Sequence, residues 1–181
     1  MNRQSFFEKL KDNRLFNEFS QLQVDTIDAI LDECESLGVT DNRQIAYIFA
    51  TAYHECFRPS RPWTRMTPMP EFGDEHYLQS KKYFPYFGRG LSQITWKSNY
   101  VKEAKRLNID LVNKPELMLV VDTAANSHVY CMKNGTYTGK KLSDYINGSK
   151  CDFVNARRII NGTDKAIDIE RYANKFLNSL T

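Results

Sequence analysis

Apolar residues recur at steps of three and four along most of the chain, which is the spacing of one face of an α-helix. Residues 24–37 follow this pattern, and Gly38 comes directly after them as a helix stop. The pattern predicts a short helix from residue 5 and further helices over about 24–37, 41–56, 99–107, 122–134, 142–146, 152–160 and 163–180. We therefore expect a mainly α-helical fold.

The segment of residues 57–90 breaks this pattern, because the helical period is lost after Cys56. Of the 23 aromatic residues in the chain (10 Tyr, 11 Phe and 2 Trp), 11 lie between Tyr53 and Tyr100, together with five of the 6 prolines. Aperiodic segments of this length are uncommon in compact domains and usually carry function. We interpret 57–90 as a functional insertion in a helical domain, and a short β-hairpin could form within it.

Size and charge limit the class of protein. A chain of 181 residues predicts one domain, residues 1–181, and we expect a monomer. The net charge of +3 is too small to indicate a nucleic-acid-binding protein. No apolar run approaches the roughly 20 residues of a membrane span, so no stable membrane association is expected. The first residues, MNRQSFFEKLKDN, are polar and lack the apolar centre of a signal peptide.

The four cysteines are far apart in the sequence, at Cys34, Cys56, Cys131 and Cys151. None forms a C-x-x-C pair, which argues against a zinc ribbon or a redox motif. Because no export signal is predicted, we expect buried, reduced thiols, with disulfides as the alternative.

The pair His54-Glu55 matches the first two residues of a zinc-binding helix motif. A zinc protease helix carries H-E-x-x-H, in which two histidines four residues apart share one face. The residue four beyond His54 is Arg58, so this motif is absent. His76 and His128 have no ligand-like spacing to each other. We therefore predict neither a catalytic metal nor another cofactor.

Glu55 is a candidate general acid. At 100° per residue it falls at the edge of the apolar face of its helix, beside Ile48, and in the last turn. Partial burial and the negative end of the helix dipole both favour the protonated carboxyl group, which a general acid needs. The alternative is a surface glutamate at a helix end, ion-paired with Arg58 or Arg61.

The segment from Phe87 to Tyr100 contains G-x-G but lacks the third glycine of a dinucleotide loop and the Lys-Ser/Thr of a phosphate loop. It also lacks the second glycine of a nucleophile elbow. In an extended segment Gln93 and Thr95 would face the same side, interleaved with apolar residues and followed by Asn99. Amides and hydroxyls beside aromatic rings suit sugar recognition; the alternative is a half-buried strand and turn.

A third cluster, residues 156–162, holds Arg157 and Arg158 and ends in Asn161-Gly162. Taken alone it is typical of a helix C-terminus with two exposed arginines and an Asn-Gly stop.

These segments together resemble the family 19 glycoside hydrolases, the plant-type chitinases. Residues 52–55 (Ala-Tyr-His-Glu) resemble the A-x-H-E segment of that family, and residues 86–100 resemble its Y-Y-G-R-G-x-x-Q-[LI]-[ST]-W-x-x-N-Y block. Residues 159–162 (Ile-Ile-Asn-Gly) are similar to its I-I-N-G block. The three segments occur in the order that the family has.

The resemblance implies a mainly α, lysozyme-like single domain with two lobes that flank a glycan cleft, lined in part by residues 57–90. It implies cleavage of β-1,4 links between N-acetylated amino sugars with inversion. By position, Glu55 resembles the general acid, Glu71 is the candidate general base with Asp74 and Glu75 as competitors, and Thr95 would hold the attacking water. The implied glycan-binding residues are His54, Gln93, Asn99, Asn161 and Tyr86.

Residues 66–71 resemble the M-x-P-[IM]-x-E run of compact phage-encoded members of the family, which act as endolysins. The leading hypothesis is thus an N-acetylmuramidase that cuts the glycan strands of bacterial peptidoglycan. It would accumulate in the host cytoplasm and reach the cell wall after release by a holin-type membrane partner. The alternatives are a chitinase, a glucosaminidase, a non-catalytic glycan-binding domain, and a cell-wall peptidase or amidase that uses Cys56 with a histidine.

Overall fold

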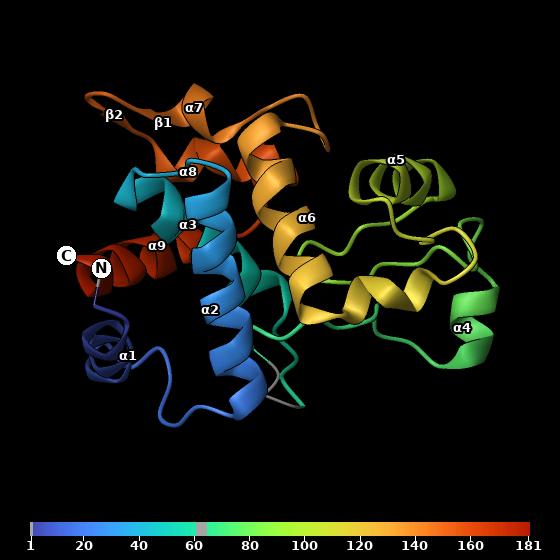
Figure 1. Ribbon diagram of the computed structural model, residues 1–181, viewed down its shortest axis with the longest axis horizontal. Coiled ribbons are helices and arrows are strands. Elements are labelled where there is room, and N and C mark those ends of the chain that lie inside the picture. Colours follow the sequence, from blue (N-terminus) through green and yellow to red (C-terminus); the bar gives the residue numbers. More distant parts are fainter. Residues whose placement is uncertain (1, 61–64) are drawn as a thin grey trace.

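The computed structural model describes residues 2–60 and 65–181. Its larger lobe is helical, and helices α4 and α5 lie to one side of it in a smaller lobe (Figure 1). The helices of the larger lobe are α1 (Arg3–Asp12), α2 (Gln21–Ser36), α3 (Asn42–Glu55), α6 (Val121–Asn134), α7 (Leu142–Tyr145), α8 (Phe153–Ala156) and α9 (Ala166–Leu180). The smaller lobe holds α4 (Glu75–Gln79), α5 (Lys97–Leu107) and the 3-10 helix Pro115–Leu119.

The helices begin and end at residues suited to those positions. The Asp41 carboxylate accepts a hydrogen bond from the backbone N–H of Arg43 at 2.9 Å and so caps the start of α3. Ser20 and Gln23 form a reciprocal capping box at the start of α2. Helix α6 ends at Gly135, whose φ of 72° lies in the left-handed region that glycine adopts without strain. These positions confirm the mainly helical fold predicted from the apolar spacing.

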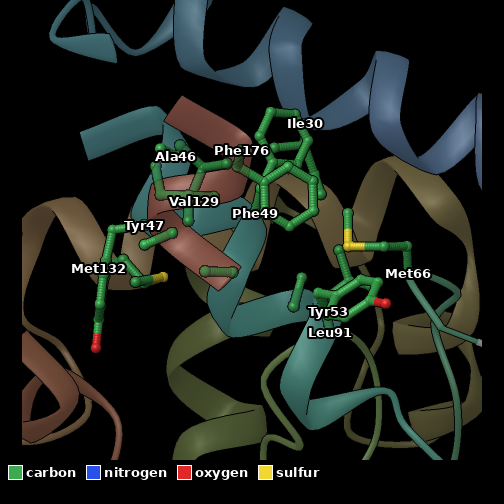
Figure 2. Packing of buried hydrophobic residues seen from close by; sticks show 14 of the residues in the cluster. Ile30, Ala46, Tyr47, Phe49, Tyr53, Met66, Leu91, Val129, Met132 and Phe176 are labelled. Atoms are coloured by element: carbon green, nitrogen blue, oxygen red, sulfur yellow. The ribbon is translucent and has the colours of Figure 1, made fainter. Parts of the chain in front are cut away.

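Helix α3 lies at the centre of the larger core, packed along α9 and next to α2 and α6. The rings of Phe49 on α3 and Phe176 on α9 stack at 5.3 Å, and Ile30 from α2 packs beside them (Figure 2). Met66 and Leu91 join the same core from the aperiodic part of the chain. Their burial anchors that part of the chain to the larger lobe at the end of α3.

The smaller lobe has a separate buried cluster of four residues: Ile94, Tyr100, Leu111 and Met118. Arg89 is buried beside it, with its guanidinium over the Phe87 ring at 3.6 Å and hydrogen-bonded to the Tyr100 hydroxyl at 3.1 Å. The presence of two hydrophobic clusters gives the two-lobed arrangement that the resemblance implied.

The single β-hairpin found in the described residues lies outside the segment where it was expected. Strands β1 (Ile146–Asn147) and β2 (Lys150–Cys151) form it, with Ile146 opposite Cys151. In the aromatic-rich region the described chain has instead one isolated antiparallel bridge between Arg89 and Ile94. The spacing of apolar residues does not predict such short pairings, because strands of two residues each are too short to show an alternating pattern.

The prediction of an extended segment through Gln93 and Thr95 is also wrong. Residues 90–93 form a tight turn closed by the Arg89–Ile94 bridge, and Gln93 has a φ of +52°. Because the backbone reverses there, alternation of side chains does not apply to this segment.

Three of the four cysteines, Cys34, Cys56 and Cys131, are buried as free thiols, as expected, but Cys151 is exposed on β2. Burial raises the pKa of the Cys34 thiol to about 12 and that of Cys131 to about 11, and it raises the pKa of Cys56 as well. These thiols stay protonated at neutral pH, which argues against Cys56 as a nucleophile.

None of the helices in the described ranges has the length and apolar character that crossing a membrane requires.

Candidate functional site

Glu55 is the last residue of α3, and the helix end that carries it is fixed by packing. Cys56 follows it, is completely buried, and lies 3.9 Å and 3.8 Å from the carbonyl oxygens of Gly90 and Leu91. The end of α3 therefore packs against the turn at residues 90–93. Glu55 itself retains 18% of its side-chain exposure, which confirms the partial burial predicted for it.

The ion-pair partner of Glu55 is Arg157, with Nη1 2.5 Å from the Glu55 carboxylate Oε1. Arg157 starts the 3-10 helix Arg157–Ile159 and is only 4% exposed, and its Nε donates to the backbone carbonyl of Asp164 at 3.0 Å. The sequence pattern predicted that Arg157 is exposed, and that prediction is wrong. Buried Arg157 places a positive charge beside the candidate acid that the helix-end interpretation did not include.

The partners proposed for Glu55 from the sequence are placed differently. Arg58 donates to the Pro70 carbonyl oxygen and stacks over the Phe72 ring at 5.4 Å, and Arg61 lies outside the described residues. No pattern in the sequence distinguishes Arg157 from Arg158, which is exposed. The three-dimensional proximity of residues 55 and 157 results from the packing of α3 against α8 and α9, which local spacing cannot reveal.

His54 lies next to Glu55 at the end of α3 and is half-buried. Burial lowers the pKa of its imidazole, an effect that the Glu55 charge opposes only in part. The imidazole is therefore neutral at pH 7, with one nitrogen able to donate and one able to accept a hydrogen bond.

Glu71, the candidate base, is held in place by two donors, one on each carboxylate oxygen. The Tyr83 hydroxyl donates to Oε1 at 2.8 Å, and the backbone N–H of Gly88 donates to Oε2 at 3.0 Å. The Glu71 backbone N–H also donates to the Gly88 carbonyl oxygen at 2.6 Å. Burial and the bond to Glu71 raise the pKa of Tyr83 to about 12, so its hydroxyl remains a donor. The orientation of the Glu71 carboxyl group is thereby fixed.

The competing carboxylates have local partners in α4. Asp74 caps that helix, since its Oδ1 accepts from the Tyr77 N–H at 2.8 Å. The Glu75 carboxylate accepts from the Gln79 side chain at 2.8 Å, one turn further on. Both residues are exposed, whereas Glu71 is half-buried. This arrangement favours Glu71, whose role as base remains a prediction.

Glu55 and Glu71 are connected through one short piece of backbone. The residue after Glu55 packs on the carbonyls of residues 90 and 91, and Met69 and Glu71 donate to the carbonyls of Gly90 and Gly88 at 3.4 Å and 2.6 Å. The bond from Arg58 to Pro70 adds a second link between the helix end and the loop that carries Glu71. The two candidate carboxylates therefore belong to one connected substructure.

Gln93, Thr95 and Asn99 form a chain of hydrogen bonds across this substructure. The Gln93 amide donates to the Met69 carbonyl at 2.9 Å and to that of Gly90 at 3.3 Å. The Thr95 hydroxyl donates to the Gln93 carbonyl at 2.9 Å, and the Asn99 amide donates to the Thr95 carbonyl at 2.8 Å. Gln93 and Thr95 thus use their side-chain donors within the protein, whereas Asn99 keeps one N–H. The acceptor oxygens of these side chains and that N–H are left for a ligand.

Gly88 lies directly against the Gln93 side chain. A Cβ at Gly88 would lie 2.9 Å from the Gln93 side-chain oxygen, so a larger residue at position 88 would require the Gln93 side chain to move. Gly88 therefore leaves room for the Gln93 amide in its observed position.

The two remaining predicted glycan-binding residues lie on different lobes. The Tyr86 hydroxyl donates to the Val112 carbonyl at 3.1 Å, and its ring packs against Tyr100 at 5.3 Å in the smaller lobe. Asn161 follows the 3-10 helix of Arg157 in the larger lobe and is exposed, with its side-chain oxygen accepting from the Gly162 N–H at 2.9 Å. Their role in glycan binding remains a prediction.

Two aromatic residues at the site were not singled out from the sequence. Trp96 is 51% exposed, with a φ of +76°, and its ring packs edge-on against Tyr83 at 5.4 Å. Tyr83 orients Glu71 through its hydroxyl. A tyrosine in an aperiodic segment carries no sequence signal for this role, but Trp96 lies within the glycine-rich block and could have been found there.

Among the described residues there is no group of three or more His, Cys, Asp or Glu side chains that could hold a metal ion.

Known structures share this architecture. Chitinase C from Streptomyces griseus has a TM-score of 0.65 at 16% identity, and the match covers 98% of this chain and 75% of that one. A bacterial family 19 chitinase has a TM-score of 0.62 at 18% identity, with 93% of both chains covered. The chain therefore has the fold of the family 19 chitinases, which confirms the lysozyme-like, mainly α fold that the sequence motifs implied.

The sequence comparisons are more limited. An acidic endochitinase from Dioscorea japonica is 30% identical over 86 residues, which span 42% of this chain and 31% of that protein. The matched part is thus less than a third of the length of that relative. No protein-family model matches the chain.

Proposed function

We propose that the protein is a glycoside hydrolase that cleaves β-1,4 bonds of an N-acetylated amino-sugar polymer. The observation that carries the proposal is the connected substructure in which Glu55, paired with Arg157, and Glu71, oriented by Tyr83 and Gly88, attach to the same short backbone segment. The family 19 chitinase fold of the chain supports the same class of reaction.

The proposed mechanism uses these groups as an acid and a base. Glu55 protonates the glycosidic oxygen as the C–O bond breaks, and Glu71 takes a proton from a water molecule that attacks the anomeric carbon from the opposite face. The Thr95 hydroxyl donates to the Gln93 carbonyl, so its oxygen is left to accept a hydrogen bond from that water. Attack from the opposite face inverts the configuration of the anomeric carbon.

Bacterial peptidoglycan is the substrate that we favour. Residues 66–71 resemble the corresponding run of phage-encoded endolysins. In this run Met66 is buried in the core, and the Glu71 carboxylate accepts a hydrogen bond from Tyr83. In this proposal the protein is an N-acetylmuramidase that meets its substrate at the cell wall, after a holin-type partner has opened the membrane of the host cell in which it was made.

Chitin is the second candidate, because the structures with the same fold are chitinases. Both polymers present N-acetylglucosamine units, so the shared residues do not separate them.

Mass spectrometry of digests tests the choice between the two. We expect purified protein to release muropeptides that end in reducing N-acetylmuramic acid and to leave chitooligosaccharides intact over the same time. Reducing N-acetylglucosamine ends would instead indicate a glucosaminidase, and rapid cleavage of chitooligosaccharides alone would favour the chitinase. Binding to either glycan with no new reducing ends would contradict the enzymatic proposal altogether.

A further inference from the structure

A cavity of about 200 Å³ is lined by residues of α5, of the C-terminal part of α6 and of the chain that follows α6. Helix α5 belongs to the smaller lobe and α6 to the larger one (Figure 1). Helix α5 contributes Asn99, Lys102, Glu103 and Arg106 to its lining, and the chain at and after the end of α6 contributes Tyr130 and Tyr137, among others. Of the candidate site residues, Asn99 alone lines this cavity.

The cavity adjoins the candidate site at two edges. On the smaller lobe, Asn99 lines the cavity and also donates to the carbonyl of Thr95. On the larger lobe, Tyr137 lines it, and the next residue, Thr138, donates to the carbonyls of Arg158 and Ile159 at 2.8 Å and 3.0 Å. Arg157, which holds Glu55, directly precedes these two residues. A glycan bound at the candidate site could therefore extend a substituent into the cavity.

The charges in the cavity leave one positive group without a counter-ion. Buried Glu103 is neutralised by Arg106, whose Nη2 lies 2.5 Å from its Oε2 and whose Nε lies 3.2 Å from both carboxylate oxygens. Lys102 is exposed at the rim and forms neither an ion pair nor a hydrogen bond with any described residue. The cavity thus favours an anionic group near Lys102.

The remaining lining suits a small amide-containing group. The Asn99 amide nitrogen is bonded to Thr95, so its side-chain oxygen is left to accept from an N–H of a ligand. Ile94 and the Tyr130 ring, which stacks on the Arg106 guanidinium at 4.1 Å, supply apolar walls. A carboxylate, an amide N–H and small methyl groups would each find a matching surface.

We propose that this cavity takes the peptide substituent of peptidoglycan, the lactyl-linked peptide that carries free carboxylates. The inference rests on the proposed function and deepens it, because chitin carries no such substituent. Lys102 pairs with a peptide carboxylate, Asn99 accepts from a peptide N–H, and the apolar walls contact the lactyl and alanine methyl groups. The cavity then makes the enzyme prefer glycan strands that retain their peptides.

The test compares two forms of one substrate: intact peptidoglycan, and the same glycan strands after an amidase has hydrolysed the lactyl–peptide amide, which removes the peptides and leaves only the short lactyl carboxylate on the sugar. We expect the kcat/KM of the natural protein to be about tenfold higher on the intact strands, the effect of one charge-assisted hydrogen bond. Lys102→Ala should reduce this ratio to near one, and Lys102→Arg should retain most of it. Lys105→Ala is the matched control, because Lys105 is exposed on the same helix but does not line the cavity.

A ratio near one for the natural protein, or an unchanged ratio in Lys102→Ala, would overturn the inference and leave the proposed hydrolase intact. Cleavage of neither form of the strands would refute the proposed function itself, and the inference with it. Because the measured quantity is a ratio within each variant, a general loss of folded protein cancels.

Discussion

Replacing Glu55 by Gln is expected to abolish cell-wall lysis and to lower kcat by a factor of at least about 10². Glutamine has the shape of the protonated acid but gives up no proton, so the leaving sugar would have to depart as an alkoxide. The glutamine side-chain oxygen can still accept the hydrogen bond from Arg157, which reaches Glu55 at 2.5 Å in the natural protein. The variant should therefore remain folded while losing the reaction.

Turbidity loss of outer-membrane-stripped cells measures this effect, with circular dichroism as the check on folding. Glu18→Gln serves as a matched control, since Glu18 is an exposed glutamate in the loop before α2. Natural lytic activity in Glu55→Gln would remove this residue from the chemistry.

Replacing Glu71 by Gln should cause a loss of similar size, on the order of 10²–10⁴ in kcat, because an amide cannot take the proton of the attacking water. The side chain can keep its position. Its oxygen can accept from the Gly88 N–H, and its NH₂ group can donate to the Tyr83 hydroxyl, which also has lone pairs. The isosteric change thus separates the chemical role of Glu71 from its structural one.

Asp74→Asn and Glu75→Gln are the comparison variants, because these are the other carboxylates that the sequence offers for the role of base. Their side chains cap and brace α4, so we expect kcat to stay within about twofold of the natural value and the main effect to fall on stability. If either variant loses more activity than Glu71→Gln, the assignment of the base is wrong.

The helical part of the fold could be predicted from the sequence because helices leave a local periodic signal. Apolar spacing and the Asp41 cap locate α3 in the sequence. They also predict that Glu55 lies at the end of that helix and is partly buried. The resemblance of the glycine-rich block to a family motif could be seen in the sequence because its residues are close together in the chain. These features depend on neighbours within a few residues of each other.

The parts that could not be predicted depend on contacts between distant residues. Arg157 is 102 residues from Glu55 in the sequence, and its burial follows from the packing of the larger lobe. The turn at Gln93 and the hairpin after α7 are each held by backbone hydrogen bonds between a few residues. Such short stretches show no repeating pattern of apolar and polar residues in the sequence. Tyr83 becomes an orienting group for Glu71 only because the loop folds back over 12 residues.

The most direct test of the central claim is the configuration of the first-formed product, followed by proton NMR during hydrolysis of a β-1,4-linked amino-sugar oligomer that the protein cleaves. An acid and a base on opposite faces of the sugar predict that the α-anomer appears first and that the β-anomer grows in only by mutarotation. The β-anomer as the first product would contradict the account, because retention requires two displacements, the first by an enzyme carboxylate or by the acetamido group of the substrate, and hence a different role for Glu71.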